Sequence, residues 1–261
     1  MTTTADVRTM DPFSFMALMG KRVIHPGGSA ATDRLLELAA IGPGERVLDI
    51  GCGVGTTAIR LAREYGAQVV AADIDPLMCE RTDANVSAAG LHDHVTVEPA
   101  DVEGLPFPDD SFDVVIAEAV TSLVDPRVAA AEMARVTRPG GRVLATDFSW
   151  HREPPDQVRD LMLSELCPGV HLHDAEGWAA IHAAAGLIDI RSDSGACPAM
   201  TPRGFIADEG VGTPLIFGRA MTRSAYFRRM SWLMPRLLRV APYIGYVLVS
   251  ARKPGTPTEA S

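Results

Sequence analysis

The sequence predicts an α/β fold in which helices cover both faces of a largely parallel β-sheet. Short apolar runs alternate with helical segments of about 10–15 residues between residues 30 and 193, which is the pattern of successive β-α-β units. The runs VVAA at 69–72 and DVVIA at 113–117 are nearly continuous in apolar character, as expected of strands buried on both sides. Glycine or proline separates most of these segments.

The expected elements follow one another in a regular order along this part of the chain. The first helix carries apolar side chains along one side, and the second ends at Gly66. Helices are expected at residues 29–41, 54–66, 76–90, 127–141 and 175–187, and strands at 45–50, 68–74, 94–99, 112–119, 141–148 and 188–192. After residue 193 the alternation stops, and the apolar run at 243–253 is the expected last strand.

The chain length of 261 residues favours one elaborated domain over two independent ones. The segment after the regular alternation is rich in methionine, aromatic residues and arginine, with seven arginines against two acidic residues. We expect an N-terminal cap segment at 1–29, a main domain formed by 30–193 and 244–252, an insert at 194–243 and a flexible tail at 253–261.

Charge and composition exclude several classes of protein. Acidic residues outnumber basic ones 33 to 24, and the net charge of −9 argues against a surface that binds a nucleic-acid backbone. The N-terminus lacks the pattern of a signal peptide, and no apolar run reaches the roughly 18 residues of a membrane-spanning helix. The four cysteines form no C-x-x-C pair. We therefore expect a reduced, cytoplasmic protein without a metal site or a disulfide framework.

A glycine-rich turn is the most informative segment of the chain. VLDIGCGVG at 47–55 is an apolar strand that runs into three alternating glycines and then into a helix. In the dinucleotide-binding fingerprint G-x-G-x-x-G, the third glycine comes one residue later than Gly55 does here. Asp49 lies at the end of the strand, where a carboxylate repels a pyrophosphate but suits an amino group or a positively charged sulfur. This pattern favours S-adenosylmethionine over a nicotinamide dinucleotide.

Two further aspartates follow the next two strands. Asp73 ends the second strand and can accept hydrogen bonds from both ribose hydroxyls of an adenosine. Asp101, after the third strand, can accept from an adenine amino group, while Val102 can pack on the adenine face. Because the carboxyl ends of parallel strands meet at one edge of a sheet, aspartates at three successive strand ends indicate one binding site. Asp75, which precedes Pro76, is expected to cap the next helix.

Four stretches of the chain together resemble a known family: VLDIGCGVG (47–55), VVAADID (69–75), PADVEGLPFPDDSFDVV (99–115) and RVTRPGGRVL (135–144). They are similar to class I S-adenosylmethionine-dependent methyltransferases, specifically the small-molecule branch that includes ubiquinone/menaquinone, sterol and arsenite methyltransferases. The resemblance implies a Rossmann-like sheet of seven strands, mostly parallel with an antiparallel last strand, helices on both faces and a helical lid insert before the last strand. It also implies S-adenosyl-L-methionine as the cofactor.

The same resemblance assigns residues to parts of the cofactor. It implies that Asp49 and the glycine turn hold the methionine part, that Asp73 and Ile74 contact the ribose, and that the adenine lies against Asp101 and Val102. The cofactor-binding residues that we expect are Asp49, Gly51, Cys52, Gly53, Gly55, Asp73, Ile74, Asp101, Val102, Ala117 and Glu118, the last two of which border the sulfonium.

A nucleic acid is not expected as substrate or partner. Methyltransferases that act on exocyclic amines of DNA bases carry N/D-P-P-Y/F after the fourth strand, whereas residues 117–120 of this chain read AEAV. The segment lacks the amide or carboxylate of that motif. Together with the acidic net charge, this indicates a small-molecule acceptor.

Methyl transfer from a sulfonium is an in-line displacement, which requires a base only when the acceptor arrives protonated. His151 and Glu118 follow strands at the edge of the sheet that carries the glycine turn, and this position makes them the candidate catalytic residues. The candidate substrate contacts are His25, Trp150, Tyr226 and Trp232.

We expect the insert to act as a substrate lid, because methionine and aromatic side chains form an adaptable apolar wall. The expected acceptor is a small apolar or aromatic molecule of natural-product type. Three alternatives stay open: an arsenite methyltransferase that holds the metalloid through Cys167 and Cys197, a membrane-peripheral methyltransferase of a lipid-like quinone that contacts the membrane through 194–243, and a non-catalytic S-adenosylmethionine-binding protein. A homodimer is also left open.

Overall fold

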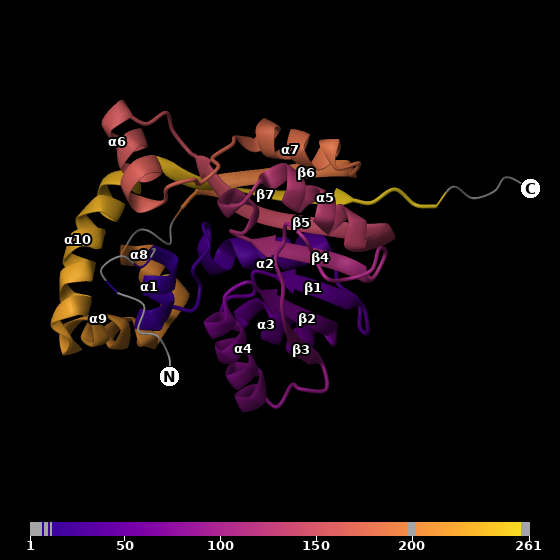
Figure 1. Ribbon diagram of the computed structural model, residues 1–261, viewed down its shortest axis with the longest axis horizontal. Helices are drawn as coiled ribbons and strands as arrows, with labels where there is room; N and C mark the ends of the chain where they lie inside the picture. Colours follow the sequence, from indigo (N-terminus) through magenta and orange to yellow (C-terminus); the bar gives the residue numbers. More distant parts are fainter. Residues whose placement is uncertain (1–6, 8–9, 11, 198–201, 257–261) are drawn as a thin grey trace, which may run out of the picture.

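A seven-stranded β-sheet with the strand order β3-β2-β1-β4-β5-β7-β6 forms the centre of the protein (Figure 1). The structure is a computed structural model that describes residues 7, 10, 12–197 and 202–256. The strands are β1 (Arg46–Ile50), β2 (Gln68–Asp73), β3 (Val95–Pro99), β4 (Phe112–Glu118), β5 (Thr137–Trp150), β6 (Ile188–Ala196) and β7 (Ile244–Arg252). Strand β7 runs antiparallel to both of its neighbours, and the other pairs are parallel. The predicted fold class is therefore confirmed.

Helices cover both faces of this sheet (Figure 1). Those of the main domain are α2 (Gly28–Ala39), α3 (Thr56–Tyr65), α4 (Pro76–Ala89), α5 (Pro126–Val136) and α7 (Ala175–Ala184). The first three share one hydrophobic cluster with the sheet, whereas α5 and α7 pack on other clusters. Three aspartates cap helices by accepting backbone N–H hydrogen bonds: Asp75 from Leu77, as the sequence predicts, and Asp125 and Asp174 at α5 and α7.

The continuous apolar character of the strands follows from this double coverage. In β4, Val114 and Ile116 belong to the cluster beneath α2 and α3, whereas Val115 and Ala117 belong to the cluster beneath α5. Successive side chains of a strand point to opposite faces, so a strand buried on both sides needs apolar residues at every position. This requirement explains why the strands could be recognised from the sequence.

The predicted boundary between α5 and β5 is wrong, and β5 and β6 are longer than the strands expected at 141–148 and 188–192. The helix expected at 127–141 ends at Val136, and Thr137 already pairs with Phe112 of β4. The Thr137 hydroxyl donates a hydrogen bond to the carbonyl oxygen of Met133 at 2.7 Å, which closes the last turn of the helix. Pro139 disfavours a helical conformation for the residue that precedes it, so the chain extends before the glycines rather than at them.

A second apolar core lies beside the sheet and is built from three separate chain segments. These are α1 (Pro12–Met19), the helical turns α6 (Asp156–Asp160) and η2 (Leu161–Leu166), and the insert helices α8 (Pro202–Glu209), η4 (Gly210–Gly212), α9 (Thr213–Thr222) and α10 (Ser224–Val240). Phe15, Met162 and Leu233 are nearly inaccessible to solvent at its centre. The insert is thus packed against the N-terminal segment and against residues 156–166, for which the sequence predicts no element.

None of the helices in the described part of the chain combines the length and the apolar character needed to span a membrane.

Candidate functional site

Strands β1, β2 and β3 follow one another toward one edge of the sheet, whereas β4 returns to the other side of β1 and the next strands continue in that direction. The site lies at the carboxyl ends of β1 and β4, where the strand order changes direction. Strand β1 has β2 on one side and β4 on the other, so the loops after β1 and β4 diverge to opposite faces. A crevice forms at such a switch point, at the carboxyl ends of the strands. A cavity of about 590 Å³ occupies this position.

The glycine turn after β1 forms the floor of the cavity. Gly51 has φ +71°, and a Cβ atom there would lie 2.2 Å from Cγ2 of Val120, so this position requires glycine for the close approach of the two loops. Gly53 has φ +57°, and a Cβ atom there would meet nothing within 4 Å. Because Gly53 also lines the cavity, the open space in front of it leaves room for a ligand beside the backbone.

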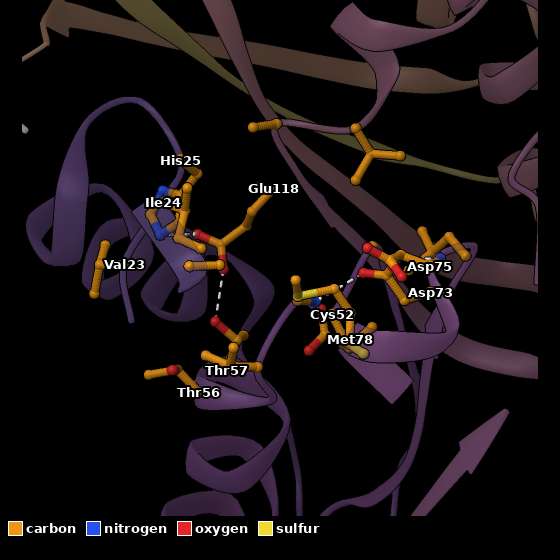
Figure 2. Close-up of a pocket in the computed structure, with 18 of the residues that line it drawn as sticks. Val23, Ile24, His25, Cys52, Thr56, Thr57, Asp73, Asp75, Met78 and Glu118 are labelled. Carbon is orange, nitrogen blue, oxygen red and sulfur yellow. Dashed lines mark hydrogen bonds and ion pairs between the residues drawn. The ribbon is translucent and has the colours of Figure 1, made fainter. Parts of the chain in front are cut away.

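Asp73 connects the end of β2 to this turn (Figure 2). Its Oδ2 atom accepts a hydrogen bond from the Gly53 N–H, and its Oδ1 atom accepts from the Asp75 N–H, both at 2.9 Å. Burial raises the pKa of Asp73 above its ordinary value. The carboxylate therefore stands at the cavity wall in a fixed orientation, beside the glycine turn.

Asp49 is the most strongly perturbed acid of the site. The residue is 2 % exposed, and its Oδ2 atom is buried without a hydrogen-bond partner among the described residues. Burial, with smaller contributions from the carboxylates of Glu118 and Asp73, raises the pKa of Asp49 to about 8. An unpartnered carboxylate oxygen that lines a cavity, with two other carboxylates nearby, fits a ligand that carries positive charge or an ammonium group.

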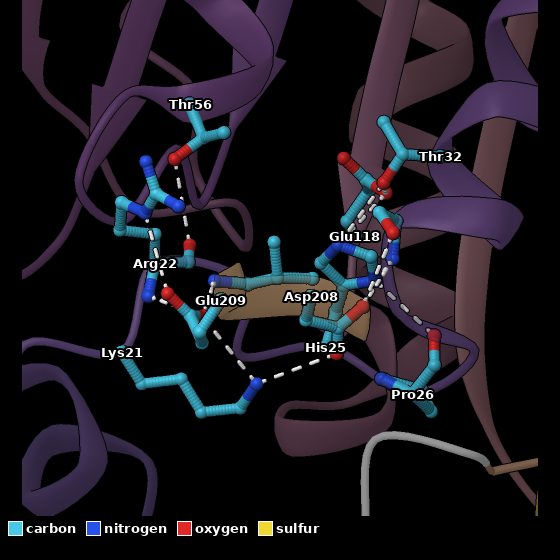
Figure 3. Close-up of polar contacts among 11 residues, drawn as sticks. Lys21, Arg22, His25, Pro26, Thr32, Thr56, Glu118, Asp208 and Glu209 are labelled. Atoms are coloured by element: carbon cyan, nitrogen blue, oxygen red, sulfur yellow. Dashed lines mark hydrogen bonds and ion pairs between the residues drawn. The ribbon is translucent and has the colours of Figure 1, made fainter. Parts of the chain in front are cut away.

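Glu118, the last residue of β4, is held by three side chains (Figures 2 and 3). The hydroxyls of Thr57 and Thr32 each donate to one of its carboxylate oxygens at 2.7 Å, and His25 Nε2 lies 3.4 Å from Oε2. His25 Nδ1 lies 3.1 Å from the carbonyl oxygen of Pro26, so Nδ1 carries a proton. Thr32 Oγ1 also lies 3.1 Å from His25 Nε2, so the hydroxyl and the imidazole stand side by side against the Glu118 carboxylate.

The N-terminal segment covers the cavity and is tied to the insert by buried charges (Figure 3). Glu209 of α8 is 2 % exposed; it accepts from the backbone N–H groups of Arg22 and Val23 and pairs with the Arg22 side chain at 3.2 Å. Lys21 lies 3.4 Å from Asp208 and 3.6 Å from Glu209. Asp208 also lines the cavity, so α8 links the insert directly to the site.

Most of the predicted cofactor residues meet at this cavity. Gly55 and Ala117 do not line it: Gly55 precedes α3 as its N-cap, and Ala117 is fully buried in the sheet. The predicted cofactor residues that line the cavity are Asp49, Gly51, Cys52, Gly53, Asp73, Ile74, Asp101, Val102 and Glu118.

His25 also lines the cavity, but the other residues predicted to contact the acceptor lie elsewhere. Trp150, Tyr226 and Trp232 pack against the second core, and Arg236 stacks on Trp232 with its guanidinium carbon 4.2 Å from the ring centre. The cavity-lining set contains none of these three side chains among the described residues. Their position therefore supports packing of the insert rather than contact with an acceptor.

His151 is exposed and does not belong to the described cavity lining. Strand β5 is much longer than β4: Glu118 pairs with Thr146, and β5 continues to Trp150. At about 3.3 Å per residue, the step from Thr146 to His151 carries the chain roughly 16 Å past the level of Glu118. The position of His151 gives no support to its prediction as a catalytic base.

Several residues of the site were not identified from the sequence. Arg22, Thr32, Thr57 and Asp208 reach the cavity from four different segments. Thr57 lies in the first turn of the helix after the glycine turn, which is a position that can be recognised. Thr32 and Asp208 reach the site only through the packing of α2 and α8, which local sequence patterns do not specify.

Comparisons with known proteins agree with this geometry. A family model described as a methyltransferase domain matches residues 47–141. An uncharacterized protein of Haemophilus influenzae is 33% identical over 223 residues, with 83% of this chain and 89% of that protein covered. The 27-O-demethylrifamycin SV methyltransferase of Amycolatopsis mediterranei is 42% identical over 118 residues, which are 45% of this chain and 43% of the relative. The chain belongs to the class I S-adenosylmethionine-dependent methyltransferases.

A solved structure supports the fold of this methyltransferase. Phosphoethanolamine N-methyltransferase 2 of Haemonchus contortus, in complex with S-adenosyl-L-methionine, superimposes with a TM-score of 0.74 at 24% identity. The match covers 93% of this chain and 56% of the other. As a member of this family the protein uses S-adenosylmethionine, whose ammonium and sulfonium groups suit the unpartnered Asp49 oxygen and the surrounding acidic side chains.

The buried charges around Glu209 should contribute strongly to stability. Replacing Glu209 with Ala leaves two backbone N–H groups without an acceptor and leaves the buried Lys21 with Asp208 alone, so Glu209→Ala should lower the free energy of unfolding by about 3 kcal/mol. Urea denaturation followed by circular dichroism measures this change. Glu64→Ala, which removes an exposed i,i+4 partner of Arg60, is the control and should cost well under ~1 kcal/mol. Equal effects of the two substitutions would contradict the assignment.

The raised pKa of Asp49 predicts how stability depends on pH. Between its ordinary value of 3.8 and the folded value of about 8, folded Asp49 holds a proton that the unfolded chain has released. The unfolded state binds fewer protons in this window, so the contribution of Asp49 to the free energy of unfolding falls as the pH rises. Urea denaturation at a series of pH values should show a shallower decline for Asp49→Asn than for the unmodified chain. The exposed Asp83 provides the control, and Asp83→Asn should leave the slope unchanged.

Proposed function

We propose that this enzyme methylates a small, apolar or aromatic molecule of natural-product type. The single observation that carries this proposal is the composition of the cavity beyond the carboxylate cluster. The N-terminal segment and the loop after β4 face one another there with mostly aliphatic side chains. These lining residues are Val23, Ile24, Ala119, Val120, Leu123 and Val124.

The name of one relative supports an acceptor of this kind. The Amycolatopsis protein is named as a methyltransferase of 27-O-demethylrifamycin SV. This chain spans less than half of that protein, so the acceptor of the relative is a guide to the class of molecule only. Cys167 and Cys197 are buried in the second core and are not part of the described cavity lining, which disfavours an acceptor held by thiolates.

In this proposal the cofactor lies across the carboxyl ends of the strands, with one part of the molecule beside each acidic residue. We place its adenine against Asp101 and Val102, its ribose against Asp73, and its methionine part over Gly53 with the amino group toward Asp49. The Asp73 oxygens are already oriented by backbone N–H groups, and each keeps a lone pair for a ribose hydroxyl. When bound, S-adenosylmethionine supplies a methyl group on a positively charged sulfur.

Glu118 acts in this proposal as an electrostatic partner of the sulfonium rather than as a base. Both of its oxygens accept hydrogen bonds from threonine hydroxyls, and His25 Nε2 lies 3.4 Å from Oε2, so the carboxylate is held in place at the cavity wall. We assign no general base to the described cavity, so the acceptor is expected to carry an available lone pair on its attacking atom. The chain then contributes alignment and exclusion of water.

The roles of Glu118 and Asp73 can be separated by comparing two ligands. S-Adenosylhomocysteine shares the ribose and amino group of S-adenosylmethionine but lacks its sulfonium charge. Glu118→Gln should weaken S-adenosylmethionine roughly tenfold or more while changing S-adenosylhomocysteine less, because only the first ligand loses a charge interaction. Isothermal titration calorimetry measures both affinities. Asp73→Asn is the matched variant and should weaken the two ligands equally. An equal loss for both ligands in Glu118→Gln would overturn the sulfonium assignment.

The acceptor class can be tested by a screen that detects S-adenosylhomocysteine formation. Aromatic and aliphatic acceptors should be methylated, whereas small polar amines and nucleic acids should not. Leu123 lines the cavity and is 42% exposed, so Leu123→Asn should fold normally but raise the KM for an apolar acceptor about tenfold. The affinity for S-adenosylmethionine should not change. Turnover of polar acceptors only, or an unchanged KM in Leu123→Asn, would refute the proposed acceptor site.

A further inference from the structure

The insert exposes an unusual share of the large apolar side chains of this protein. Within the part of the chain that the structure describes, twelve large apolar side chains are exposed, and seven of them lie between residues 202 and 240. Val211 is 96% exposed, Met221 70% and Leu215 68%. The seven residues are Ile206, Val211, Leu215, Phe217, Met221, Phe227 and Leu238. A concentration of this kind on one small region marks an interaction surface.

The helices that carry these residues form the outer edge of the molecule. Figure 1 shows α9 and α10 at the left edge of the view, away from the strands β1 to β4. Helix α9 buries only Ile216 and Ala220, which are one turn apart, so a narrow line of this helix packs inward. Helix α8, η4 and α9 contact one another in sequence, which joins their exposed side chains into one surface. We call α8, η4 and α9, together with residues 223–228, the insert tip.

The charges of the insert tip are positive on its outer side. The two carboxylates of the insert point inward: Asp208 accepts from the Ser29 N–H at 2.9 Å, and Glu209 pairs with Arg22. Arg203, Arg223 and Arg228 are exposed, and none of them pairs with a carboxylate among the described residues. The outer surface therefore combines apolar side chains with unneutralised guanidinium groups, although the whole chain carries a net charge of −9.

We propose that the insert tip is a peripheral docking surface for an anionic lipid bilayer. Apolar side chains on a convex helical surface can enter the boundary between headgroups and acyl chains, and arginines around them can bind lipid phosphates. An acidic protein partner could form ion pairs with the arginines. It would also need a groove for each isolated, highly exposed apolar side chain, such as Val211. Asp208 belongs to the same helix as Ile206 and lines the cavity, so docking would bring the cavity close to the membrane. The proposal does not depend on the acceptor class.

Co-sedimentation with vesicles tests this surface. The full chain should bind vesicles of phosphatidylcholine that contain phosphatidylglycerol, and bind vesicles of phosphatidylcholine alone much less. The variant Val211→Ser/Leu215→Ser/Met221→Ser should lower the partition coefficient on the order of a hundredfold, because it removes three inserted side chains. The variant Arg203→Gln/Arg223→Gln/Arg228→Gln should lower it about fivefold for each arginine, and added salt should have a similar effect.

Val128→Ser/Ile188→Ser is the matched control, since both side chains are exposed apolar residues outside the insert. This control should bind vesicles like the unmodified chain, and all variants should bind S-adenosylmethionine with unchanged affinity by calorimetry, which shows that they are folded. Failure of the unmodified chain to bind anionic vesicles would overturn the proposal. So would unchanged binding of the apolar variant. A dimer in light scattering that the apolar variant converts to a monomer would assign the surface to a second copy of the chain instead.

Discussion

The burial of three acidic side chains at one edge of the sheet, together with the repulsion that Asp49 experiences from its two acidic neighbours, is the constraint around which this methyltransferase is organised. Asp49, Asp73 and Glu118 come from three adjacent strands whose carboxyl ends meet, and burial strengthens every interaction among them. The fold meets this constraint differently at each residue. Asp49 takes up a proton, Asp73 accepts backbone N–H groups, and Glu118 is paired with His25. A cationic ligand relieves the same repulsion, so binding energy is available before any specific contact is considered.

The parts of the site that could be predicted are those fixed by strand ends. Asp73 ends the strand β2, which is recognisable because it is apolar and buried, and Asp101 follows the edge strand β3; parallel strands bring both residues to one edge of the sheet whatever the surrounding loops do. The helix before β5 is predicted to continue to the glycines at 140 and 141, which are strong local signals. It ends earlier, because Pro139 disfavours a helical residue before it and because Thr137 pairs with Phe112 of β4.

The parts that could not be predicted depend on lengths and on packing between distant segments. His151 and Glu118 both follow strands, but β5 extends past β4 and carries His151 away from the cavity. Trp232 is an aromatic residue of the insert, as an acceptor contact would be, but it packs into a core formed with α1 and residues 156–166. Composition indicates that such side chains need an apolar environment. It does not specify whether a ligand or another helix provides that environment.

The ion pairs between the N-terminal segment and α8 connect the cover of the cavity to the insert. Lys21, Asp208 and Glu209 form a buried cluster of ion pairs, so moving Lys21 away from both carboxylates would leave its charge in an apolar environment and is therefore costly. Residues 21–25 and α8 are therefore held together, and displacing residues 21–25 from the cavity would break these buried contacts with the insert. Asp208 couples the two more closely still, because it binds Lys21 and Ser29 on one side and faces the cavity on the other. Access to the carboxylate cluster is thus controlled by residues far from it in the sequence.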